Sequence, residues 1–442
     1  MIKRIQNSLS SISERDSNIF KQIRWSFIFK ALAFIAYFYS ISIQLDILGA
    51  EMYGVWATLL SIITWVVFFD FGVGNGIKNH LTTAFARNNI QQARKIISTS
   101  YVIIFLMAVI IFVAIALAVY GFSMRAMLNT AIIPEATLKK LVIILFFFVA
   151  CHFVLAFVRQ FIFAVQKNAL NELEQFVFYL FLIAGLLLAG VRGNRDLISV
   201  AAVYGVALAL SKIILTIYFF SRYSNLIPDR RFFTRELIKP LASNSAAFFA
   251  LQLVSLAVLL TDRVIIIQLL GPLHVTEYDL VYRLFSVFLV LHSIINAPMW
   301  SAYTEAYAKQ DVIWIKKNIR RMNYVVLLIL PALFFLVVWH EYIFSLWLGE
   351  GFAISKDVVT AMAVLIVVMT FANNYAFLLN AINKLGFQFY MLGVGAIVKL
   401  PIAMLLIKYT SMEGEAVIWA TVISLLIFSM SAPLYVRTGL FK

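Results

Sequence analysis

Long apolar runs separated by short polar stretches repeat along the whole chain. About 20 apolar residues are needed to cross the hydrocarbon core of a bilayer. Because every backbone polar group in lipid must be paired within its own segment, each such run is expected to be a helix. The pattern predicts an all-α integral membrane protein with about twelve transmembrane helices, at 25–47, 53–76, 96–120, 140–162, 172–191, 197–220, 240–270, 278–300, 322–347, 357–380, 387–408 and 413–436.

The second half of the chain repeats features of the first half. Leu48-Gly49 returns as Leu270-Gly271, and Ala84-Phe85-Ala86-Arg87 returns as Ala306-Tyr307-Ala308-Lys309, each about half of the 442-residue chain later. An internal repeat of six helices predicts two lobes that insert the same way up, with a substrate path between them (6+6 repeat). The predicted parts are an N-terminal segment 1–24, an N-lobe 25–220, a linker 221–239, a C-lobe 240–436 and a tail 437–442.

Composition supports the membrane class. Hydrophobic residues make up 63% of the chain and charged residues 13%, whereas a soluble domain is about half apolar and a quarter charged.

The single cysteine, Cys151, excludes a disulfide or a thiolate metal cluster within the chain. The five histidines lack metal-ligand spacing, so neither a metal nor another cofactor is expected. His152 and His292 lie inside predicted spans, where each is either a core histidine or part of a proton relay.

The positive charges are distributed unevenly between the two sides of the membrane. With the N-terminus in the cytosol, the cytosolic segments carry 24 of the 36 Lys and Arg residues and the opposite segments carry seven. This bias predicts that both termini are cytosolic. The net charge of +15 is therefore explained by topology and by attraction to anionic headgroups, and nucleic-acid binding is not expected.

Five cations fall inside the predicted spans and away from the span ends. Burying such a group in lipid costs about 2.5–3.5 kcal/mol on insertion scales, so these residues usually face a cavity or a partner. Arginine suits phosphate because its planar fork donates two parallel hydrogen bonds. The candidate substrate-binding residues for an anion are Arg263, Arg283, Lys30, Lys399 and Lys212.

Structural roles are open for three of these residues. Lys30 and Lys212 can extend their side chains to the inner interface without binding substrate. Lys399 lies two residues before Pro401, and its ammonium group can cap carbonyls that the proline leaves without a partner.

The two arginines differ in this respect. Arg263 directly follows Asp262, and neighbours in a helix point about 100° apart, so this pair cannot meet face to face. At least one of the two needs another partner, and Arg263 is expected to face a cavity. Arg283 stands four residues after Asp279, a spacing that permits an ion pair within one helix.

Acids and glycines near the spans supply further candidates. Asp70 and Asp262 are the main acids identified near or within spans, and they are possible coupling or gating residues. Gly72, Gly74 and Gly76 follow Asp70, and a glycine series inside a membrane span favours close helix packing or a helix break over a nucleotide-binding loop.

The motifs resemble those of a known transporter family. In the first half, LGAEMYG from Leu48 is followed by an apolar span that ends in DFGVGNG from Asp70 and by the basic AFARNN loop. In the second half, DRVII from Asp262 precedes LG and then Tyr278. This arrangement resembles the O-antigen and capsular polysaccharide repeat-unit flippases, which form the polysaccharide transporter family of the multidrug/oligosaccharidyl-lipid/polysaccharide superfamily.

The resemblance implies a MATE-like fold and a transporter of the bacterial inner membrane rather than an enzyme. The implied substrate is an undecaprenyl-pyrophosphate-linked oligosaccharide, with the first, second, seventh and eighth spans lining a central cavity. A polymerase and a chain-length regulator are the implied protein partners. The main alternative is a multidrug or cation antiporter of the same superfamily, which would need acids deep in the spans. A polymerase or glycosyltransferase is disfavoured because no large outer loop is predicted.

Overall fold

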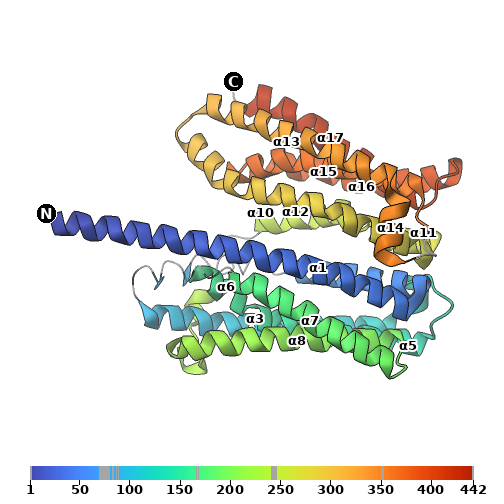
Figure 1. The fold of residues 1–442 in the computed structure, drawn as a ribbon, viewed down its shortest axis with the longest axis horizontal. Coiled ribbons are helices and arrows are strands. Elements are labelled where there is room, and N and C mark those ends of the chain that lie inside the picture. The colour runs from blue at the N-terminus through green and yellow to red at the C-terminus, as the bar shows by residue number, and fades with distance from the viewer. Residues whose placement is uncertain are drawn as a thin grey trace. The chain divides into compact units, whose positions relative to one another are not determined.

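The computed structural model describes residues 2–68, 80–81, 84–85, 87, 89–165, 167, 169–239, 246–349 and 353–440. The described residues form helices and connecting turns without a β-strand, which confirms the all-α prediction (Figure 1). Ten helices are long and apolar enough to cross a membrane, and an eleventh span results if the bent pair α10 and α11 is counted as one. One of the ten is α1, which contains residues of two predicted spans.

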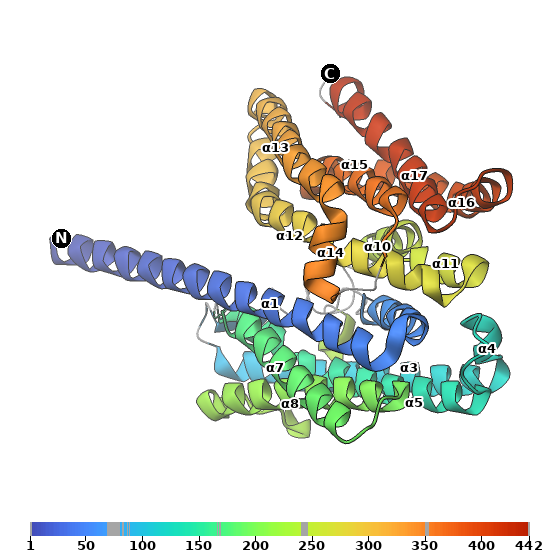
Figure 2. The ribbon, with the colours of Figure 1, turned by 45° about the vertical axis from the view of Figure 1, so that its right-hand side comes forward.

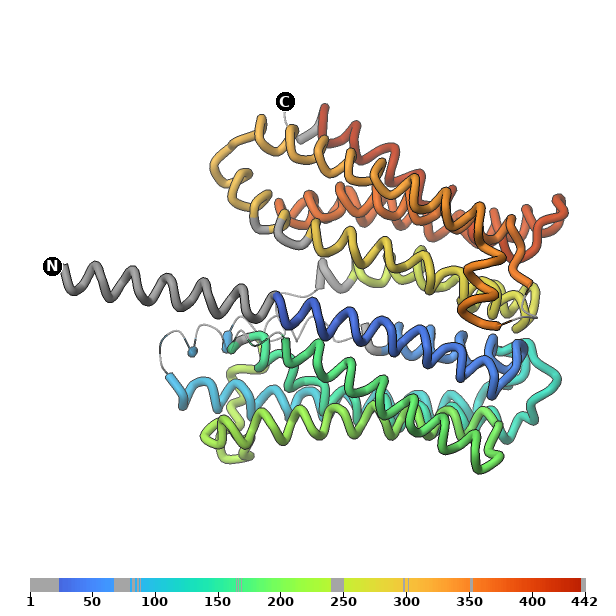
Figure 3. Tube along the Cα trace, viewed as in Figure 1, coloured from blue at the N-terminus to red at the C-terminus, as the bar shows by residue number. Residues whose placement is uncertain are grey.

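Helix α1 (Ile2–Phe68) is interrupted at Gly49 (Figure 3). Its first arm contains the predicted span 25–47, and its second arm contains residues 53–68 of the predicted span 53–76, whose other residues lie outside the described ones. Gly49 has φ 68° and ψ 169°, a conformation that only glycine adopts without strain. Gly271, its partner in the sequence repeat, has φ 93° and ψ 175°. The two Leu-Gly pairs therefore share one backbone turn as well as one sequence pattern.

The first compact unit joins the chain up to Gly49 with helices of the first half. Helix α5 packs against α3 and α8, and α8 packs against α7; these helices run from cyan to green in Figure 3. The described helices of this unit, besides the first arm of α1, are α3 (Ile90–Gly121), α5 (Glu135–Ala156), α6 (Val158–Ala164), α7 (Ala169–Val191) and α8 (Leu197–Arg222).

The start of α8 is capped by an aspartate outside the membrane-spanning segment. The carboxylate of Asp196 accepts hydrogen bonds from the backbone N–H of Ser199 at 3.0 Å and from its hydroxyl at 2.6 Å. Partial burial acts to raise the pKa of Asp196, but these bonds and one from the Ile198 N–H outweigh burial and lower it.

The predicted linker 221–239 lies on the first unit as three short 3₁₀ turns: η1 (Ser224–Leu226), η2 (Arg230–Phe232) and η3 (Arg235–Leu237). It packs mainly against the beginning of α3, and η1 also contacts α8. The N–H of Asp229 donates to the Ser98 hydroxyl at 3.1 Å, and the N–H of Thr234 donates to the Thr99 hydroxyl at 3.0 Å. Arg94 completes the attachment with an ion pair to Asp229 at 3.7 Å.

The second compact unit contains Ala50–Phe68, Arg125–Ile132 and the chain from Ala246 onward. Helices α15 and α17 are its centre, since more than half of the apolar window of each is buried. Helix α15 packs against α12, α13 and α17, and α17 lies beside α16 (Figure 2). The described helices are α10 (Ala246–Leu259), α11 (Asp262–Leu270), α12 (Pro272–Ala308), α13 (Val312–Val338), α14 (His340–Leu348), α15 (Lys356–Ala381), α16 (Leu385–Tyr409), α17 (Gly414–Tyr435) and the π-helical η4 (Val436–Leu440), with the short α4 (Met124–Met127) at the boundary between the units.

Candidate functional site

A broken helix lies at the centre of the candidate site in the second unit. Helices α10 and α11 are bent by 41° at a break between Leu259 and Asp262. A break leaves backbone carbonyls without helical partners, which is costly in lipid unless other groups bond to them. The Leu260 carbonyl accepts hydrogen bonds from Ser61 at 3.2 Å and Trp65 at 3.0 Å, both on the second arm of α1. The Val258 carbonyl accepts one from the Lys399 ammonium group.

Asp262 begins α11 and is the first of two buried acids. Its side chain is 2% exposed and forms an ion pair with Lys399 of α16. Its carboxylate also accepts hydrogen bonds from Tyr278 of α12 at 2.7 Å and Thr421 of α17 at 2.8 Å. A carboxylate at a helix N-terminus is stabilised by the helix dipole. Asp262 therefore joins four helices around the break.

Asp279 of α12 is the second buried acid, and it binds both predicted arginines. Its side chain is completely buried. Arg263 donates to its Oδ1 from Nε at 2.7 Å, and Arg283 donates to its Oδ2. Tyr53 of α1 donates a third hydrogen bond to Oδ2 at 2.9 Å. The predicted pair of Arg283 with Asp279 is thus confirmed, and Arg263 shares the same carboxylate.

Aromatic rings complete the environment of Arg263. Its guanidinium lies 5.4 Å from the ring centre of Tyr278 and 5.1 Å from that of Tyr282, distances at which the ring faces attract a cation. The two rings are stacked at 5.9 Å. The guanidinium is therefore held by one carboxylate and two aromatic rings.

A close backbone contact brings the second arm of α1 to this cluster. A Cβ atom built on Gly54 would lie 1.8 Å from the Pro272 carbonyl oxygen at the start of α12. Thr276 donates to the Ala50 carbonyl one turn before Gly54. Only glycine permits this approach, which places Tyr53 within reach of Asp279.

The described residues of the cluster include two acids and three cations. Asp262 is paired with Lys399, and Asp279 is shared by Arg263 and Arg283. Guanidinium groups donate charge-assisted hydrogen bonds to anionic oxygens, which is the chemistry expected of a site for an anion.

The remaining predicted cations lie elsewhere. Lys212 of α8 is buried in the first unit, and its ammonium group forms an ion pair with Glu174 of α7, so it does not extend to the membrane interface. Lys30 on α1 is partly exposed and has no ion pair within the described part of the chain. The predicted Asp70 and the glycines Gly72, Gly74 and Gly76 lie outside the described residues.

These contacts bear on three of the alternatives that the sequence left open. Lys399 caps a carbonyl of α10 rather than those freed by Pro401 in its own helix. His292 bonds through Nε2 to Asn374 at 2.9 Å, as expected of a core histidine. His152 differs, because its Nδ1 is buried without a hydrogen-bond partner in the described structure.

Two buried acids hold these cations besides Asp262. The expectation that Asp70 and Asp262 are the main acids near the spans is wrong, because Asp279 and Glu174 are also buried, at 0% and 4% exposure. The i, i+4 spacing indicated the pairing of Asp279 with Arg283 but not its contact with Arg263. Glu174 was missed, because it is paired with a residue on the next helix, which periodicity alone does not reveal.

Comparison with known proteins agrees with the expectation of transport. Residues 19–303 match the family described as polysaccharide biosynthesis protein. The "Putative O-antigen transporter" of Salmonella typhimurium is 25% identical over 389 residues, which cover 81% of this chain and 83% of that protein. The "Putative O-antigen export protein" of Yersinia pseudotuberculosis is 21% identical and covers 79% of this chain and 80% of its own.

Solved structures show the same fold. An inward-facing multidrug resistance MATE family transporter of the MOP superfamily superposes with a TM-score of 0.76 at 14% identity, covering 93% of this chain and 97% of its own. A MOP superfamily transporter from Pyrococcus furiosus superposes with a TM-score of 0.68 at 13% identity, covering 94% of both chains. The fold is therefore MATE-like, and because the family match covers well over half of the sequence, the chain belongs to the polysaccharide biosynthesis protein family.

Proposed function

We propose that the protein is a flippase that moves an undecaprenyl-pyrophosphate-linked oligosaccharide, the repeat unit of an O-antigen or capsule, across the bacterial inner membrane. The observation that carries this proposal is the likeness over about four fifths of the chain to relatives named as O-antigen transport and export proteins. The MATE-like fold supports alternating access, in which two six-helix lobes expose one site to each side in turn.

The two guanidinium groups at Asp279 support an anionic substrate group. A guanidinium has five N–H donors, and Arg263 directs two of its nitrogens to Asp279. The other donors are suited to a phosphate oxygen, which accepts charge-assisted hydrogen bonds. In this proposal Arg263 and Arg283 bind the pyrophosphate, and Lys30, Lys212 and Lys399 assist binding or hold the helices in place.

The cation antiporter alternative is less well supported by these contacts. An antiporter that binds a cationic drug needs acids whose charge is not already neutralised. Asp262, Asp279 and Glu174 each have a Lys or Arg partner at ion-pair distance. Drug or cation binding at these acids would have to displace a bonded cation, which is costly in a buried site.

The topology is part of the proposal. The lobes extend over 25–220 and 240–436 and are joined by the linker 221–239, and both termini lie in the cytosol. The charge bias between the two sides of the membrane supports this orientation. A polymerase and a chain-length regulator are the proposed protein partners, because they would use the translocated repeat unit.

The test is deletion of the gene followed by leaflet-resolved analysis of undecaprenyl-linked intermediates. We expect a single repeat unit to accumulate on the cytosolic face while surface polymer disappears. Normal surface polymer combined with greater sensitivity to cationic dyes would contradict the proposal and favour the antiporter.

The arginine role is tested by complementing that strain with Arg263→Ala and Arg263→Lys. Both variants should fail to restore export while reaching the membrane at wild-type level, because lysine keeps the charge but lacks the planar fork. Arg195→Ala is the matched control, because this arginine is exposed and its ion pair with Asp46, at 3.9 Å, is exposed as well. Normal polymer in a stably expressed Arg263→Ala strain would contradict the assignment.

A further inference from the structure

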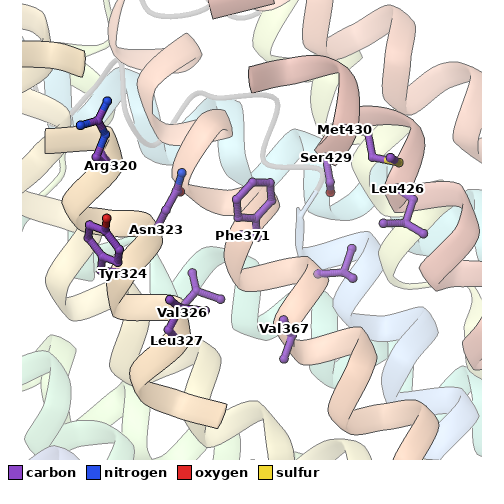
Figure 4. Close-up of a pocket in the computed structure, with 11 residues that line it drawn as sticks. Arg320, Asn323, Tyr324, Val326, Leu327, Val367, Phe371, Leu426, Ser429 and Met430 are labelled. Carbon is purple, nitrogen blue, oxygen red and sulfur yellow. The ribbon is translucent and has the colours of Figure 1, made fainter. Parts of the chain in front are cut away.

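A cavity of about 490 Å³ lies in the second unit between α13, α15 and α17 (Figure 4). Leu327 of α13, Val367 and Phe371 of α15, and Leu426 of α17 form apolar walls. Figure 4 shows the α15 side chains standing between those of the two flanking helices. The cavity is separate from the Asp262 and Asp279 cluster, and its chemistry suits a hydrocarbon chain.

The cavity opens towards the surface of the helix bundle. Leu327 is 54% exposed and Met430, at the α17 edge, is 69% exposed. Tyr324 stands on the same face of α13 at 60% exposure. In a membrane-spanning bundle such a surface faces lipid tails, so a lipid chain can enter the cavity sideways from the bilayer.

A cation lies at one end of the cavity. Arg320 of α13 lines it, is exposed, and has no ion pair among the described residues. Arg320 is about 27 Å along the helix axis from Val338, where α13 ends. This length is close to the hydrocarbon thickness of about 30 Å, so Arg320 is placed at headgroup depth with the apolar walls beneath it.

We propose that this cavity binds an anionic phospholipid of the bilayer, with one acyl chain between α13, α15 and α17 and the phosphate on Arg320. Apolar walls below a cation match the two ends of such a lipid, and basic pockets between transmembrane helices are a common form of phospholipid site. The proposal is independent of the flippase assignment, because no residue of the Asp279 cluster is involved.

Bound lipid would also affect a buried polar network. Asn323 lines the cavity and donates to the Tyr375 hydroxyl at 3.0 Å. Its Oδ1 accepts a hydrogen bond from Asn374 at 3.1 Å, and Asn374 bonds to His292 of α12. The lipid therefore contacts a chain of hydrogen bonds that connects α13, α15 and α12, and it should stabilise this part of the bundle.

The experiment measures binding of phosphatidylglycerol and phosphatidylcholine with matched acyl chains to the purified full-length protein in detergent. We expect saturable binding of phosphatidylglycerol and markedly weaker binding of phosphatidylcholine. Arg320→Gln should weaken phosphatidylglycerol binding about tenfold, the loss of one charge-assisted contact. Val367→Phe should fill the cavity and prevent binding of both lipids. Arg321→Gln removes the same charge from the next position of α13, which does not line the cavity, and should retain near wild-type affinity.

Three outcomes would overturn the proposal. Both lipids carry a phosphate, but only phosphatidylglycerol has a net negative charge, so equal binding would show that the net charge is not recognised. Equal losses in Arg320→Gln and Arg321→Gln would show non-specific attraction. Displacement of phosphatidylglycerol by a lower concentration of undecaprenyl phosphate would assign the cavity to the substrate tail instead. If Val367→Phe fails to fold, lipid binding by Arg320→Gln still tests the proposal, because Arg320 is exposed and its replacement should not disturb folding.

Discussion

Replacing Asp279 with asparagine should strongly destabilise the second unit. The side chain is completely buried, and its partners Arg263 and Arg283 are 11% and 14% exposed. Asparagine keeps the shape but removes the negative charge, so two guanidinium groups lose their shared counter-ion. Breaking a buried ion pair by removing one partner costs about 3–5 kcal/mol. We expect about 3 kcal/mol here, because the partial exposure of both arginines lets water compensate in part.

The assay is thermal unfolding of the purified protein in detergent. A loss of about 3 kcal/mol corresponds to a fall in melting temperature of about 6–12 °C for a unit of this size. Asp357→Asn is the matched control, since this acid lies in the exposed first turn of α15 and should change the melting temperature little. The pairing is measured by combining Asp279→Asn with Arg263→Gln, which should cost less than the two separate losses together. A wild-type melting curve for Asp279→Asn, or strict additivity in the double variant, would refute the reasoning.

Three further predictions concern stability and use the same unfolding assay. Gly54→Val should cost about 3 kcal/mol or prevent folding, because its Cβ would overlap a backbone carbonyl oxygen, whereas Gly190→Val has open space around it and should be tolerated. Glu174→Gln or Lys212→Met alone should cost about 3–5 kcal/mol, and an apolar replacement of both should recover most of the loss. Asp196 has a lowered pKa in the folded state, so its charge stabilises the folded protein above the ordinary aspartate pKa of about 3.9, and this contribution is lost as the pH falls through the folded-state pKa. The stability of Asp196→Asn should therefore depend less on acid pH than that of the wild type. An unchanged acid dependence would contradict this.

Much of the fold followed from the apolar pattern. The twelve windows and the repeat predicted the helices, and the Leu-Gly pairs marked both turns with positive φ at Gly49 and Gly271. The window 322–347 was less accurate, because α13 ends at Val338 and the separate helix α14 follows. The break is marked in the sequence only by the polar pair His340-Glu341 at the start of α14, and two polar residues inside a long apolar window do not end a predicted span.

The candidate site was less predictable than the fold. Charged residues inside apolar windows are visible in a sequence, which is why Arg263, Arg283 and Lys399 were found. The i, i+4 spacing also indicated the pair of Arg283 with Asp279. The other partners are not visible in the sequence, because contacts such as that from Tyr53 to Asp279 join residues up to 226 positions apart. Which cation meets which acid depends on how helices from distant parts of the chain pack.

The contacts of Asp279 connect substrate binding with movement in the proposed mechanism. A pyrophosphate that reaches Arg263 competes with Asp279 for the same guanidinium, because both are oxygen acceptors of like charge. If the arginine turns towards the substrate, Asp279 keeps its bond to Tyr53 and loses part of its charge compensation. That loss weakens the link between α11 and α12 while strengthening the link between substrate and α11. In this mechanism, Arg263 exchanges the carboxylate of Asp279 for the pyrophosphate of the substrate. This exchange would couple substrate binding to a rearrangement of the helices.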